Sequence, residues 1–261
     1  MRRSALLLAG LLPLSAAAAD SGWVPLPGHP DFASVLRWPD QAGSVKVAPF
    51  ELMRTPVTNG QFLRFVLHHP QWQRGRVPEV FAEARYLQHW EGPVRLGPHA
   101  RAGQPVTHVS WFAADAYCRA LGGRLPTWAE WEYAAAADAT RPDARADPAW
   151  REAILAWYAR PSNRPLPDVG QGGANVYGVH DLNGLVWEWV EDHAALLVSA
   201  DNRDQGDPDV LQFCGAGALS TDDRENYAVL MRIALLSSLD AADVTGNLGF
   251  RCARPLPGEL P

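Results

Sequence analysis

The chain has 261 residues, a formal net charge of −6 and a pI near 5.7, with 47% apolar and 20% charged residues. This balance excludes a disordered chain and a disulfide-only mini-protein, and the scattered Lys and Arg argue against nucleic-acid binding. No uncharged apolar run is long enough to cross a membrane, and the 11 Trp, 22 Gly and 22 Pro predict a loop-rich fold with bulky core side chains.

The N-terminus has the pattern of a secretory signal peptide over residues 1–19. Arg2 and Arg3 precede a short apolar run at 5–14, and small residues follow up to a cleavage site near Ala19. A retained anchor helix is the alternative, but the run is too short to span a bilayer. We therefore expect a single domain over residues 20–261, located in the periplasm.

The remaining elements are predicted in chain order from apolar spacing and capping residues. An extended arm at 23–49 leads into a strand at 45–52, and Thr58 precedes a helix at 59–68. The aperiodic stretch at 71–104 predicts a long surface excursion. Ser110 caps a helix that stops at 122–123, Thr127 caps another, and turn residues dominate 160–178. The class is α+β with little regular secondary structure.

Three cysteines are present, Cys118, Cys214 and Cys252. An oxidising compartment would allow two of them to pair. Their spacing alone leaves all three pairings open and forms no zinc-ligand pattern.

Four segments together resemble the formylglycine-generating enzyme, or sulfatase-modifying factor, superfamily, which is a variant of the C-type lectin-like fold. They are TPVTNGQF at 55–62, PVTHVSWFAADAYCRALGGRLPTWAEWEYAA at 105–135, YGVHDLNGLVWEW at 177–189 and GNLGFRC at 246–252. The resemblance covers nearly the whole chain after the predicted signal peptide. It implies a disulfide between Cys118 and Cys252.

The segment NGLVWEW resembles the calcium loop of the family. Residue by residue, the resemblance implies oxygen ligands from Asn183, Gly184, Val186 and Glu188, as a hard cation requires. In the alternative interpretation Glu188 pairs with a nearby arginine. His108 is expected to be a hydrogen-bonding core residue, not a metal ligand.

The active site is where the sequence departs from the family. Formylglycine-generating enzymes hold copper between two cysteines, and the corresponding region at 213–238 contains Cys214 alone. Formylglycine formation is therefore not expected. The candidate catalytic residues are Cys214, Asp222, Asp223, Arg224 and Arg232, with copper or iron as a further cofactor. In the alternative interpretation Cys214 is a buried apolar residue.

The function expected from the resemblance is that of a periplasmic maturation or accessory factor for another exported protein or metalloenzyme. Exported members associated with nitrite and nitrous oxide reductases similarly lack the copper pair. The alternatives are an oxidoreductase acting on a peptide-derived substrate, as in pyoverdine maturation, and a non-catalytic lectin-like binding module. The expected partner is an exported protein or peptide.

Overall fold

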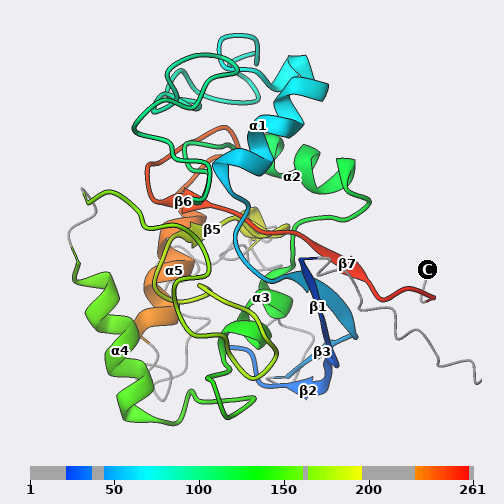
Figure 1. Cartoon of the computed structure of the whole chain (residues 1–261). Helices are drawn as coiled ribbons and strands as arrows, with labels where there is room; N and C mark the ends of the chain where they lie inside the picture. The colour runs from blue at the N-terminus through cyan, green and yellow to red at the C-terminus, as the bar shows by residue number, and fades with distance from the viewer. Residues whose placement is uncertain (1–21, 37–43, 161–163, 196–226, 259–261) are drawn as a thin grey trace, which may run out of the picture.

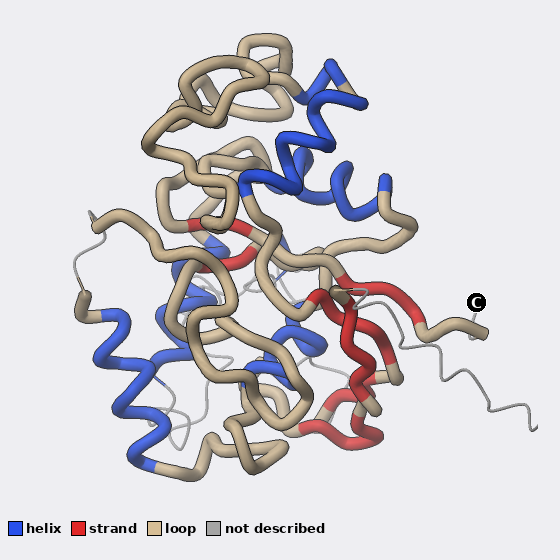
Figure 2. The backbone as a smooth tube through the Cα atoms, in the orientation of Figure 1, coloured by secondary structure: helices blue, strands red, loops and turns tan. Residues whose placement is uncertain are grey.

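The computed structural model describes residues 22–36, 44–160, 164–195 and 227–258, and loops join its short helices and strands (Figures 1 and 2). The mixture of helices and strands confirms the predicted α+β class. In chain order the elements are β1 (Trp23–Leu26), β2 (His29–Phe32), β3 (Val45–Val47), β4 (Phe50–Met53), α1 (Asn59–His68), η1 (Pro70–Trp72), α2 (Trp111–Ala120), α3 (Trp128–Ala135), α4 (Pro148–Tyr158), β5 (Trp187–Glu188), η2 (His193–Ala195), α5 (Tyr227–Ser237), β6 (Leu248–Gly249) and β7 (Ala253–Pro255).

Strand β4 is the centre of a three-stranded antiparallel sheet in the order β1-β4-β7. Leu26 is paired with Phe50, and Glu51 is paired with Arg254. Leu26, Phe50 and Leu52 are buried, so one face of this sheet packs on the core. The pairing places the first and the last strand of the domain on the two sides of β4 (Figure 1).

The single strand predicted over residues 45–52 is in fact two strands, β3 and β4. They separate at Ala48 and Pro49, because Pro49 has no N–H to donate to a ladder. Strand β3 pairs instead with β2. Gly28 (φ +70°) precedes β2, and a Cβ there would lie 2.4 Å from the Val47 carbonyl oxygen, so this close approach requires glycine.

Three helices begin at the side chains that the sequence predicted. Thr58 accepts a hydrogen bond from the Gln61 amide in a capping box at the start of α1, and α1 has the predicted bounds. Ser110 caps α2, and Thr127 forms a second capping box with Glu130 at the start of α3. Each cap satisfies an N–H group that the helix leaves unpaired.

The stretch at 71–104 is not wholly a surface excursion, and this prediction is wrong in part. Tyr86, Leu87 and Trp90 are buried in the core. The Trp90 indole packs edge-on against Phe62 of α1 and donates a hydrogen bond to Asn59 (3.0 Å). An irregular backbone brings these side chains inward without the periodicity by which a core segment is identified.

Helices α4 and α5 were not predicted. Asp147 caps α4 and Pro148 occupies its first turn, as helix starts favour. Helix α5 lies against α4 and η2, beside the central ladder of β5 and β6 (Figure 1). Among the described residues, no helix combines the length and the apolar character that crossing a membrane requires.

The structure joins Cys118 of α2 to Cys252, the residue before β7, by a disulfide. These are the two cysteines that the family resemblance pairs. The bond links the start of β7 to α2.

Candidate functional site

Glu188 and Arg251 form a fully buried ion pair in the middle of the domain, with no exposed side-chain area. The guanidinium donates from Nε to Oε2 and from Nη2 to Oε1, both at 2.8 Å. Trp131 of α3 donates a third hydrogen bond to Oε2 (2.9 Å). Both carboxylate oxygens therefore accept hydrogen bonds, from α3 and from the segment between β6 and β7.

Of the calcium ligands predicted at 183–188, the carboxylate of Glu188 does not fit the structure. A cation bound to Glu188 would lie beside the buried Arg251 guanidinium, so that carboxylate is not free to bind one. The alternative interpretation, in which Glu188 pairs with an arginine, describes the observed contacts. Calcium bound by the carbonyl groups of Asn183, Gly184 and Val186 stays a prediction.

Arg232 of α5 is buried, although it was predicted to be catalytic. Its guanidinium lies 3.4 Å from the Trp131 ring centroid and donates from Nη2 to the Glu188 carbonyl oxygen (2.6 Å). Burial lowers its pKa to about 10, and its Nε has no hydrogen-bond partner among the described residues. Among the described residues, Arg232 lines a small cavity of about 20 Å³ together with Trp131 and Tyr158, and it is packed into the core.

The other predicted catalytic residues, Cys214, Asp222, Asp223 and Arg224, lie outside the described residues. Helix α5 follows that segment directly. Arg232 is the member of the predicted catalytic set that lies within the described residues.

A cavity of about 250 Å³ opens where α4, β5 and the segment before β6 meet. We call it the aromatic cavity, because the rings of Trp157, Tyr158 and Trp187 contact one another along its wall. The Tyr158 and Trp187 ring centroids are 4.8 Å apart and nearly parallel, and Trp157 lies 5.4 Å from Trp187. Its lining residues are Trp157, Tyr158, Arg160, Arg164, Pro165, Leu166, Pro167, Gly184, Leu185, Trp187 and Asn247.

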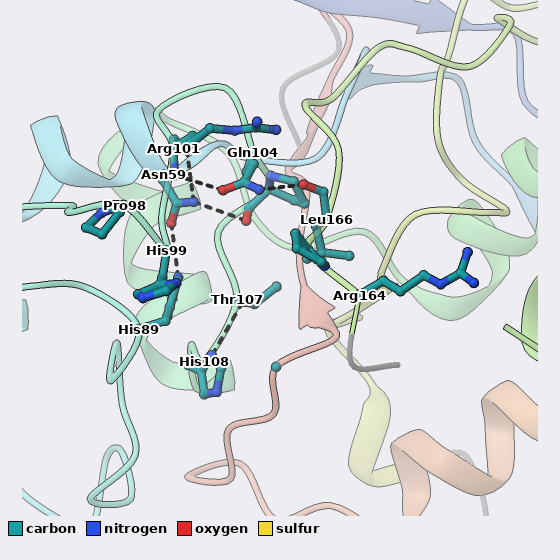
Figure 3. A pocket seen from close by; sticks show the side chains of 13 residues that line it. Asn59, His89, Pro98, His99, Arg101, Gln104, Thr107, His108, Arg164 and Leu166 are labelled. Carbon is teal, nitrogen blue, oxygen red and sulfur yellow. Dashed lines mark hydrogen bonds between the residues drawn. The ribbon is translucent and has the colours of Figure 1, made fainter. Parts of the chain in front are cut away.

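Residues 164–166 also line a second cavity of about 360 Å³, which we call the histidine cavity (Figure 3). The rings of His89 and His108 lie against each other there, with centroids 4.9 Å apart. The described residues contain no group of three His, Cys, Asp or Glu side chains suited to a metal. In Figure 3 the Arg164 guanidinium points away from these imidazoles.

The hydrogen bonds of Asn59 fix the tautomer of His89. Asn59 Oδ1 accepts from the Trp90 indole, so this oxygen is also the acceptor for His89 Nε2 at 3.4 Å. The neutral ring therefore keeps its lone pair on Nδ1, which is buried and has no partner among the described residues. Burial, reinforced by His108 and Arg74, lowers the pKa of His89 to about 4.

Comparison with known proteins identifies the family. The model of the sulfatase-modifying factor enzyme 1-like domain matches residues 28–256. The chain belongs to this family.

Three relatives show how far the similarity extends. The formylglycine-generating enzyme of Streptomyces coelicolor is 32% identical, over 80% of this chain and 79% of that protein. The hercynine oxygenase of Mycolicibacterium smegmatis is 35% identical over 56% of this chain, which spans only 37% of that longer protein. The structure of PvdO from Pseudomonas aeruginosa aligns with 90% of this chain and 94% of its own at 18% identity, with a TM-score of 0.45.

In this member of the family, two of the segments that carry the resemblance meet at the aromatic cavity. Trp187 comes from the WEW segment and Asn247 from the GNLGFRC segment, and the Trp187 amide donates to the Asn247 carbonyl oxygen (2.8 Å). The sequence reasoning missed the other wall, formed by Trp157, Tyr158 and Arg160. The Asp147-Pro148 pair was the available signal for the helix that positions them.

Proposed function

We propose that this family member is a periplasmic maturation or accessory factor, which binds a segment of another exported protein in the aromatic cavity. The single observation that supports this proposal best is the convergence of Trp187 and Asn247, from two separate family segments, on an open cavity. Stacked aromatic side chains beside exposed prolines suit an extended peptide, since they offer apolar contact area with little entropy to lose.

The burial of Arg232 favours a binding role for this cavity. The guanidinium lies over the Trp131 ring and donates to the Glu188 carbonyl oxygen, and Arg232 is not among the residues that line the aromatic cavity. The aromatic rings and the two arginines at 160 and 164 would then provide the recognition.

An oxidoreductase acting on a peptide-derived substrate is the second candidate. The similarity to a hercynine oxygenase supports it, because that relative is named for a redox reaction. Cys214 is the residue through which such chemistry would run.

The test is deletion of the gene in its own host, followed by mass and metal analysis of every exported protein. We expect one exported protein to lack a modification or its metal in the deletion strain. Wild-type protein should restore it, and Trp187→Leu should not. An unchanged set of exported proteins would overturn the proposal.

Two further variants separate the candidates. Restoration by Cys214→Ser would support an accessory role, whereas failure of this variant would favour the oxidoreductase. Glu91→Gln, which changes an exposed residue of an ion pair remote from the cavity, serves as the matched control and should restore maturation fully.

A further inference from the structure

The rim of the aromatic cavity is basic. Arg160 and Arg164 line it and are exposed, and no Asp or Glu of the described residues lines it. Neither guanidinium forms an ion pair with a described carboxylate, whereas nearby Arg101 is paired with Asp168 (3.1 Å). Two arginines that have no carboxylate partner among the described residues are thus available to a ligand.

This local charge contrasts with the chain as a whole, whose formal net charge is −6. A positive rim on an acidic protein attracts an anionic group to one place, because the remaining surface repels it. Guanidinium groups also bind carboxylates by two parallel hydrogen bonds, which adds directional selectivity.

The wall next to the rim selects for a flat group. Trp187 is half-buried and stacks on Tyr158, and both line the cavity together with Pro165. A planar ring that enters the 250 Å³ space meets aromatic faces within a distance suited to offset stacking.

We propose, on the basis of the proposed function, that the aromatic cavity selects a carboxylate adjacent to an aromatic ring, as in an Asp-Tyr or Glu-Phe pair of a client protein. The ring packs on Trp187 and Tyr158, and the carboxylate binds Arg160 and Arg164. A free aromatic acid has the same chemistry and would bind in the same way.

The test is calorimetric titration of the mature protein with three acetylated and amidated tetrapeptides, Gly-Asp-Tyr-Gly, Gly-Asn-Tyr-Gly and Gly-Lys-Tyr-Gly. We expect the Asp peptide to bind about three- to tenfold more tightly than the Asn peptide, the range for exposed or partly desolvated charge pairs. The Lys peptide should bind most weakly. Raising the salt from about 20 to about 200 mM should reduce the preference for Asp.

The protein variants are Arg160→Gln/Arg164→Gln and, as the matched control, Arg95→Gln/Arg119→Gln, which removes two exposed arginines elsewhere. The first pair should remove the preference for Asp over Asn, and the control should keep it. Equal binding of the Asp and Asn peptides, tightest binding of the Lys peptide, or no binding at millimolar concentration would each overturn the inference.

Titration with 4-hydroxyphenylacetate identifies the source of the carboxylate. If this free acid binds as tightly as the Asp peptide and with the same arginine dependence, the selectivity is supported and the natural ligand is a small aromatic acid. Loss of charge selectivity together with normal maturation in the host would refute this inference alone, and leave the proposed function intact.

Discussion

Substitution of Glu188 by Gln tests whether the buried ion pair is the central support of the fold. Gln preserves the volume and the acceptor for Trp131 but removes the charge, so Arg251 becomes an uncompensated buried cation. Arg251 also donates to the carbonyl oxygens of Met53 and His180, which prevents it from turning toward solvent without breaking those bonds.

The magnitude follows from the burial of both groups. Breaking a buried pair from one side costs about 3–5 kcal/mol, against a total stability of about 5–15 kcal/mol for an ordinary domain. In urea this corresponds to a midpoint lower by about 1–2 M. The exposed pair of Glu91 and Arg95 provides the control, and Glu91→Gln should cost less than about 1 kcal/mol.

The assay is equilibrium urea unfolding, followed by tryptophan fluorescence, in calcium and in EGTA. The double variant Glu188→Met/Arg251→Met should be more stable than Glu188→Gln, because it leaves no unpaired charge. A cost below about 1 kcal/mol for Glu188→Gln would refute the reasoning. Calcium that raises the midpoint of the wild type but not of Glu188→Gln would also refute it, by showing that Glu188 binds the ion.

Three further predictions concern stability. Replacing Cys118 and Cys252 by Ala should lower the free energy of unfolding by about 4–5 kcal/mol in the chain-entropy model, since the bond closes a long loop. The wild type in reductant should lose the same free energy of unfolding, which is the check. Thr127→Ala should cost about 1 kcal/mol by thermal unfolding, with Thr127→Ser close to the wild type. Acid should lower the free energy of unfolding through His89, because the pKa of this residue is about 4 in the folded protein and about 6.5 in the unfolded chain. The contribution of the neutral ring to stability is complete above about pH 6.5. It falls by up to about 3 kcal/mol as the pH drops toward 4. Stability measured from pH 7 to 4.5 should therefore fall less for His89→Gln, and an identical slope in both proteins would contradict the assignment.

The helix starts were predictable because capping is local. Thr58, Ser110 and Thr127 lie one residue before their helices and bond amides within the next turn. Asp147 has the same role before α4, and the apolar residues of that helix have helical spacing, so its signal was also present.

The site was less predictable because its contacts are long-range. The sequence provided Glu188 and the alternative of an arginine partner. The choice of Arg251, 63 residues further along the chain, depends on the pairing between β5 and β6. The burial of Trp90 likewise depends on an irregular loop that no periodicity describes. Family resemblance identified the segments, and only the three-dimensional structure brought Trp187 next to Tyr158.

The place of β7 in the sheet determines when the protein can finish folding. Strand β4 is synthesised early, yet its partner on one edge follows about 200 residues later, as the bond between Glu51 and Arg254 shows. Until that point β4 has an open edge, Glu188 lacks its partner Arg251, and Cys118 lacks its partner Cys252. A nascent chain therefore cannot complete this sheet, the buried ion pair or the disulfide until residues 251–255 have been synthesised.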